Sequence, residues 1–207
     1  MNTNDKEVRA YMCDVSTRED EKHGNVLEGI PIVYDVPTDI GGMWKEIIDR
    51  GALDQADLKD VRFLVNHDVD SIPLARSRNN NENSTMQMTI EEDGLHIRVD
   101  LDTEGNPRAK ELYSAVKRED VSGMSFMFNV KGDKWDDLDS EYPTRHITAL
   151  DKVFEVSAVT FPAYEQTSIN ARSVETGKAS LDSAREALEN ARKVEELRKQ
   201  ILERCKK

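Results

Sequence analysis

Ser125 lies in a segment, residues 124–130, in which apolar and polar side chains alternate. In an extended strand, side chains two residues apart share a face, so the apolar residues form one face and Ser125 lies on the other. If the apolar face belongs to the core, Ser125 points toward solvent or a cleft. A neutral hydroxyl is a poor nucleophile at neutral pH, so Ser125 needs a nearby base to act in acyl transfer.

His67 is the best-placed base in the sequence. It follows the apolar run 61–65, which predicts a buried strand whose polar end reaches a surface. Imidazole, with an ordinary pKa of about 6.5, can take a proton during attack and return it to the leaving amine. The other histidines occupy a charged loop (His23), an alternating hairpin (His96) and a short polar strand (His146), where solvated or hydrogen-bonded histidines are usual.

Glu155 lies between Phe154 and Val156 in a strongly apolar strand. A carboxylate in such a place is costly unless it is paired or half exposed, and orienting His67 is one such pairing. An ordinary outward-facing carboxylate is the other interpretation, and the pattern alone favours it. Ser157 shares the face of Glu155 and can also bond to an imidazole.

The segment 66–70, Asn-His-Asp-Val-Asp, also contains residue types that bind zinc or manganese. No second histidine or cysteine lies at ligand spacing in the sequence. We therefore expect neither a metal nor a cofactor.

The elements that must position these residues are mainly strands. Strands are predicted at residues 8–15, 26–36, 61–65, 123–131, 145–150 and 152–161. The first of these could pair with the second. Two alternating runs, 86–90 and 95–101, flank an Asp-Gly pair and predict a tight hairpin. Amphipathic helices are predicted within residues 41–53 and after Asn106-Pro107. The many strands and few helices of residues 1–172 therefore predict an α+β barrel or sandwich.

The C-terminal segment differs in composition from the rest. Residues 173–207 hold nine basic and seven acidic residues, a net +2, which leaves −14 on residues 1–172. From Leu181 an apolar stripe predicts a long amphipathic helix, and Ser183 with Glu186 forms a capping box at its start. The spacing fits a scaffold-like or coiled-coil contact and a helix packed on its own domain equally well.

Composition excludes several classes of protein. The chain has 207 residues and a net charge of −12, which disfavours binding to phosphate backbones. Its only cysteines, Cys13 and Cys205, form neither a disulfide framework nor a CxxC motif. No apolar signal region and no run of about 18 apolar residues is present, so we expect a soluble, unexported protein without membrane contact.

The chain lacks GxSxG, HExxH, P-loop and GxGxxG motifs, but four ordered blocks resemble a known family. The blocks are EGI at 28–30 followed by GAL at 51–53, FLVNHD at 63–68, GMSFMF at 123–128 and FEVSAVTFPAY at 154–164. Together they resemble the prohead maturation proteases of tailed bacteriophages, a branch of serine proteases related to the herpesvirus assemblins. The resemblance covers residues 7–172.

The resemblance implies a role for each site residue. It implies His67 as general base, Ser125 as nucleophile and Glu155 as the carboxylate that orients His67, with Asp151 in reserve. One departure from the family pattern is Ala75, where members often have glycine. The fold that it implies is a mainly antiparallel β-barrel flanked by helices, over residues 1–172, with a charged C-terminal helix over 173–207.

The implied activity is cleavage of peptide bonds during prohead maturation. Substrates would be the major capsid protein, scaffold segments and the protease itself, inside the assembling prohead in the bacterial host cytoplasm, from a phage or prophage gene. A homodimer is expected because related viral proteases often dimerise. The alternative is a non-catalytic capsid assembly factor that uses the same fold.

Overall fold

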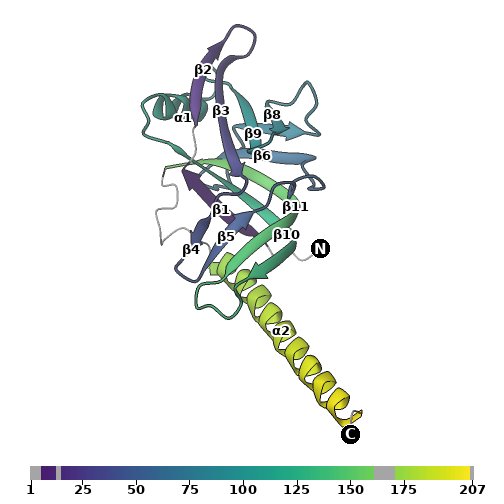
Figure 1. Cartoon of the computed structure of the whole chain (residues 1–207). Coiled ribbons are helices and arrows are strands. Elements are labelled where there is room, and N and C mark those ends of the chain that lie inside the picture. The colour runs from purple at the N-terminus through teal and green to yellow at the C-terminus, as the bar shows by residue number, and fades with distance from the viewer. Residues whose placement is uncertain (1–5, 13–14, 161–170, 206–207) are drawn as a thin grey trace.

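The computed structural model describes residues 6–12, 15–160 and 171–205 (Figure 1). Eleven of the thirteen described elements are strands and two are helices, which makes an α+β fold. The strands form two sheets, one of seven strands and one of four. None of the described helices is long and apolar enough to cross a membrane.

The seven-stranded sheet carries the candidate site. Its main path runs β1 (Glu7–Met12), β10 (Gly123–Asp136), β11 (Thr144–Val159), β5 (Trp44–Ile48) and β4 (Thr38–Ile40). The N-terminal part of β10 lies between β1 and β11, both antiparallel to it, while β11 also pairs in parallel with β6 (Asp60–Val65). β7 (Ala75–Arg78) pairs with β6. Several register shifts interrupt the long β10–β11 ladder, as β-bulges do where paired strands bend.

The four-stranded sheet is antiparallel throughout. Its order is β2 (Ser16–Asp20), β3 (Gly24–Val33), β9 (Gly94–Leu101) and β8 (Met86–Ile90). The hairpin predicted from the Asp-Gly pair is confirmed as β8–β9. Gly94 has a φ of 153°, and a Cβ there would lie 1.9 Å from the Ile32 carbonyl oxygen, so only glycine fits this position.

One hydrophobic core joins both sheets and the first helix. α1 (Pro107–Lys117) is the helix predicted after Asn106, whose side chain accepts a hydrogen bond from the Arg108 N–H as an N-cap. Its apolar face is buried. Representative members of the core are Leu27, Phe63, Leu95, Leu112, Phe126 and Val156.

Three predictions about the elements are wrong. Residues 44–48 form strand β5 rather than a helix, because Trp44, Glu46 and Ile48 alternate as buried residues with less buried neighbours. β1 pairs with β10 and not with β3, the strand predicted at residues 26–36. Residues 144–159 form one strand, β11, where two were expected.

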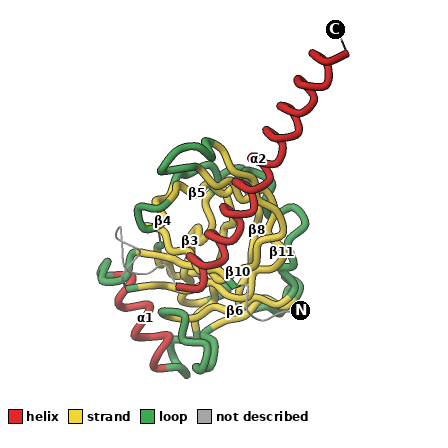
Figure 2. The backbone as a smooth tube through the Cα atoms, turned by 90° about the horizontal axis from the view of Figure 1, so that it is seen from below, coloured by secondary structure: helices red, strands yellow, loops and turns green. Residues whose placement is uncertain are grey.

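α2 (Ala171–Cys205) leaves the body of the protein and points away from it with the C-terminus at its far end (Figures 1 and 2). The helix begins before Ser183, so the predicted capping box does not mark its start. Leu181 is buried, whereas Val194 and Leu197 are exposed. The described strand pairings do not close a barrel, and both the closed barrel and the division at residue 173 stay predictions.

Gly177 allows α2 to lie directly on Trp44. A Cβ at position 177 would lie 2.4 Å from Cζ2 of Trp44, which is fully buried. Alanine favours an exposed helix by about 1 kcal/mol over glycine, but here overpacking outweighs that gain. Gly177→Ala is expected to lower the free energy of unfolding by about 1–3 kcal/mol in urea titrations. Asn190→Ala, an exposed change in the same helix, is the control; equal behaviour of the two variants would contradict the contact.

Candidate active site

The turn that follows β6 presents His67. Asn66 and His67 both adopt left-handed backbone conformations, with φ values of 51° and 58°. Such conformations cost a non-glycine residue about 1–2 kcal/mol each and persist only where neighbouring structure holds them. Here the Asn66 N–H donates to the Ala158 carbonyl at 2.9 Å, and the Asn66 side-chain oxygen accepts from the Thr160 N–H at 3.0 Å. The turn is thereby fixed to the end of β11.

Glu155 of β11 contacts the His67 ring. The distance from His67 Nδ1 to Glu155 Oε1 is 2.6 Å, and the side chains are 23% and 3% exposed respectively. The carboxylate can accept only, so Nδ1 carries the proton and Nε2 is left as the basic nitrogen. The interpretation of Glu155 as an outward-facing carboxylate is wrong, because its side chain is buried against His67.

Pairing with a carboxylate does not by itself distinguish His67. His23, His96 and His146 also contact aspartates, at 3.0, 2.7 and 2.7 Å. Those aspartates are 22%, 58% and 25% exposed, so water screens each contact. Glu155 is far more buried, and a charge interaction strengthens as water is removed. The His67–Glu155 pair therefore differs from the others in its environment.

Ser157 links both members of this pair. Its hydroxyl donates to Glu155 Oε2 at 2.5 Å and accepts from the backbone N–H of His67 at 3.2 Å. The side chain is fully buried. The prediction that Ser157 shares the face of Glu155 is confirmed. Its hydroxyl contacts the backbone N–H of His67, however, and not the imidazole ring.

Ser125 lies on β10 directly opposite Ser157 in the β10–β11 ladder. Residues opposite each other in an antiparallel ladder point to the same face, with Cα atoms about 4.5–5.5 Å apart. The predicted face is correct, since Met124, Phe126 and Phe128 are buried in the core. The structure thus brings Ser125 beside the residue that holds the His67–Glu155 pair.

The expected exposure of Ser125 is wrong. Its side chain is 0% exposed, and its hydroxyl donates to the Arg9 carbonyl of β1 at 2.7 Å. At this point β10 is an interior strand, and a buried donor is normally paired. Asp151, the reserve carboxylate, lies four residues before Glu155 on β11, where its carbonyl accepts from the Asp57 N–H.

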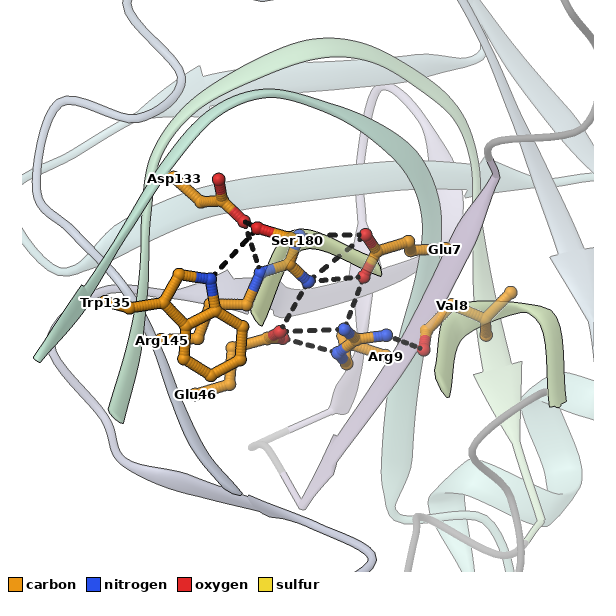
Figure 3. A network of polar contacts seen from close by, with 8 residues as sticks. All are labelled: Glu7, Val8, Arg9, Glu46, Asp133, Trp135, Arg145 and Ser180. Atoms are coloured by element: carbon orange, nitrogen blue, oxygen red, sulfur yellow. Dashed lines mark hydrogen bonds and ion pairs between the residues drawn. The ribbon is translucent and has the colours of Figure 1, made fainter. Parts of the chain in front are cut away.

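A buried ionic cluster joins β1 to β5, β10 and β11 (Figure 3). Arg9 donates to Glu46 and to Glu7, each at 2.5 Å at the closest approach. Arg145 contacts the same two carboxylates at 3.1 and 3.0 Å and also Asp133 at 2.7 Å. The same Arg9 whose carbonyl holds Ser125 is therefore anchored through its side chain.

Ion pairs inside the cluster shift the pKa values of two of its members. Burial raises the pKa of Glu46, but the ion pairs with Arg9 and Arg145 outweigh it and leave that pKa below its ordinary value. Burial lowers the pKa of Arg145, and its carboxylate partners raise it above the ordinary value. Sequence reasoning missed the cluster; the alternation of Glu7 and Arg9 and the placement of Glu46 in an apolar run were its only local signals.

The cluster also reaches α2. Asp133 accepts a hydrogen bond from Ser180 at 2.7 Å, and Ser180 in turn accepts from the Trp135 indole N–H at 2.9 Å (Figure 3). Ser180 belongs to the part of α2 that contacts the body. The base of the terminal helix and the strand beside Ser125 are therefore joined by one continuous set of polar contacts.

Among the described residues, one group of three could hold a metal ion, and it is not the segment 66–70. It consists of Glu91, Asp93 and His96 on the β8–β9 hairpin, with both carboxylates exposed. The His67 ring contacts Glu155, and the His67 backbone N–H donates to Ser157.

The chain matches the family model of the caudovirus prohead serine proteases over residues 13–180. The chain belongs to this family. No curated protein and no solved structure matches it. The region matched to the prohead proteases includes His67, Ser125, Glu155 and Ser157, whereas β1, with Glu7 and Arg9, precedes it. Membership implies a serine peptidase with a role in capsid maturation.

Proposed function

We propose that this chain is a serine endopeptidase in which Ser125 is the nucleophile, His67 the general base and Glu155 the residue that orients the base. The contact between His67 and the buried carboxylate of Glu155, on the strand next to Ser125, is the observation that carries the proposal. A lone histidine or a lone strand serine would not suffice, because the hydroxyl needs a base and the base needs a fixed tautomer. Family membership supplies the reaction class.

The proposed reaction is acyl transfer in two steps. The Ser125 hydroxyl turns from the Arg9 carbonyl toward Nε2 of His67, gives up its proton and attacks the substrate carbonyl carbon. The imidazolium, held by Glu155, returns the proton to the leaving amine as the peptide bond breaks. Water then attacks the acyl group on Ser125, with His67 again accepting and returning the proton, and releases the carboxylic acid.

The proposed substrates are the major capsid protein and scaffold segments, followed by the protease itself. The proposed place of action is the interior of the assembling prohead in the bacterial host, and the proposed active form is a homodimer. A closed barrel over residues 1–172 and a separate role for residues 173–207 complete the proposal. The polar contacts from Ser180 to the cluster around Arg9 support a link between that terminal segment and the catalytic body.

Incubation with the cognate capsid precursor tests this function. The protein is expected to release discrete fragments whose ends mass spectrometry can map. A fluorophosphonate probe, which reacts with activated serines, is expected to label the peptide that contains Ser125 and not the one that contains Ser157. An intact precursor together with an unlabelled Ser125 would contradict the proposal.

A further inference from the structure

We propose that Ser157 is a positioning residue of the active site, whose hydroxyl fixes both the Glu155 carboxylate and the backbone of His67. This inference deepens the proposed function and rests on it. Ser157 would not touch the substrate. Its effect on the reaction would pass through the two residues that it holds.

The hydroxyl of Ser157 uses its donor and an acceptor site in different directions. Its one proton goes to Glu155 Oε2 at 2.5 Å, and its oxygen accepts the His67 N–H at 3.2 Å. A serine hydroxyl has one donor and two acceptor sites, so both bonds can be made at once. Since the side chain is fully buried, water does not compete for these bonds.

The bond to Glu155 selects one orientation of the carboxylate. The terminal torsion of a glutamate is broad, so a single contact at Oε1 leaves the carboxylate free to rotate. His67 Nδ1 contacts Oε1 and Ser157 contacts Oε2, so both oxygens are held. With two fixed points, Glu155 presents Oε1 to the ring in one position.

The bond to His67 holds a backbone that is unfavourable on its own. His67 has a φ of 58°, in the left-handed region that non-glycine residues avoid. Asn66, also left-handed, is fixed by the Ala158 carbonyl and by Thr160, and Ser157 fixes the next peptide N–H. Ser157 therefore constrains where the ring begins, while Glu155 constrains where it points.

Ser157 is poorly suited to be the nucleophile itself, although it faces the same side as Ser125. Its proton is given to a carboxylate, and the contact with His67 is with the peptide N–H and not with the ring. Attack through Ser157 would break both bonds that hold the base. The geometry thus separates a reacting serine from a holding serine on adjacent strands.

A matched pair of variants tests the role of the hydroxyl. Threonine and valine have the same shape, and only threonine retains the hydroxyl, so Ser157→Thr and Ser157→Val share any packing effect. We expect the fluorophosphonate probe to label Ser125 about 10- to 100-fold more slowly in Ser157→Val than in Ser157→Thr, by analogy with the loss when a group that orients a metal-ligating histidine is removed. For cleavage of the precursor, Ser157→Val is expected to have a lower kcat than Ser157→Thr and the same KM. Ser77→Ala, at a buried serine of β7, is expected to label at the normal rate.

Nuclear magnetic resonance of protein labelled with nitrogen-15 at histidine gives a readout that needs no activity. The His67 Nδ1–H resonance, assigned by its loss in His67→Gln, is expected to shift or broaden in Ser157→Val and to stay near its normal position in Ser157→Thr. An unchanged resonance with equal labelling rates in both variants would overturn the inference, as would equally slow labelling in both. If Ser125 of the unaltered protein is never labelled, the proposed catalytic function fails, and the resonance still decides whether Ser157 holds His67.

Discussion

Ser125→Ala is expected to reduce the rate of capsid-precursor cleavage by at least about 10⁴-fold, because it removes the atom that attacks the substrate carbonyl. The substitution also removes the hydrogen bond that the Ser125 hydroxyl donates to the Arg9 carbonyl, so folding must be measured alongside activity. Circular dichroism and urea unfolding check the fold, and mass mapping of the cleaved precursor measures the rate. Ser77→Ala, which shortens another fully buried serine outside the site, is the matched control.

His67→Ala is expected to cause a loss of similar size, and the double variant is the sharper experiment. When nucleophile and base act as one unit, removing both costs little more than removing either one. The variant Ser125→Ala with His67→Ala is therefore expected to be about as slow as each single variant. If the losses in the double variant multiplied instead, the two residues would act independently, and the proposed acyl transfer would be refuted.

Local patterns in the sequence predicted the elements whose causes are local. The β8–β9 hairpin follows from alternation around Asp93-Gly94, and α1 follows from the Asn106 cap and Pro107. Residues 44–48 were misassigned because Trp44, Ile47 and Ile48 fit the spacing of a short helix as well as that of a strand. The segment is a strand because it pairs with β11, which lies about 100 residues away in the sequence.

The candidate site was only partly predictable for the same reason. Residue chemistry and family resemblance pointed to His67 and Ser125, but their proximity depends on the order β6–β11–β10 in the sheet. Glu155 was ambiguous because its burial is set by that order and by the position of His67. The contact of Ser157 with the His67 backbone depends on a left-handed turn that no local pattern announces.

Glu46→Gln is expected to lower the free energy of unfolding by about 1.5–3 kcal/mol at neutral pH. The change keeps the size of the side chain but leaves Arg9 and Arg145 buried with one carboxylate fewer. Glu7 still pairs with both arginines and Asp133 with Arg145, but glutamine puts an NH2 donor where a carboxylate oxygen accepted, so a buried guanidinium N–H loses its charged acceptor. Urea denaturation measures the loss. Asp139→Asn, which breaks the exposed pair with Arg192, is the control and is expected to have no measurable effect.

The pH dependence of this difference identifies its electrostatic origin. The pKa of Glu46 is lowered in the folded protein from an ordinary value of 4.5, so the folded state releases this proton more readily than the unfolded state. The stabilisation by Glu46 is therefore complete above about pH 4.5 and is lost as the pH falls through the lowered folded-state pKa. Urea titrations of the unaltered protein and of Glu46→Gln are expected to converge over that acidic range. If the difference stayed constant with pH, packing at position 46 would be its cause, and not the ion pairs of Glu46 with Arg9 and Arg145. Those ion pairs would then not be what stabilises β1, the strand whose Arg9 carbonyl holds Ser125.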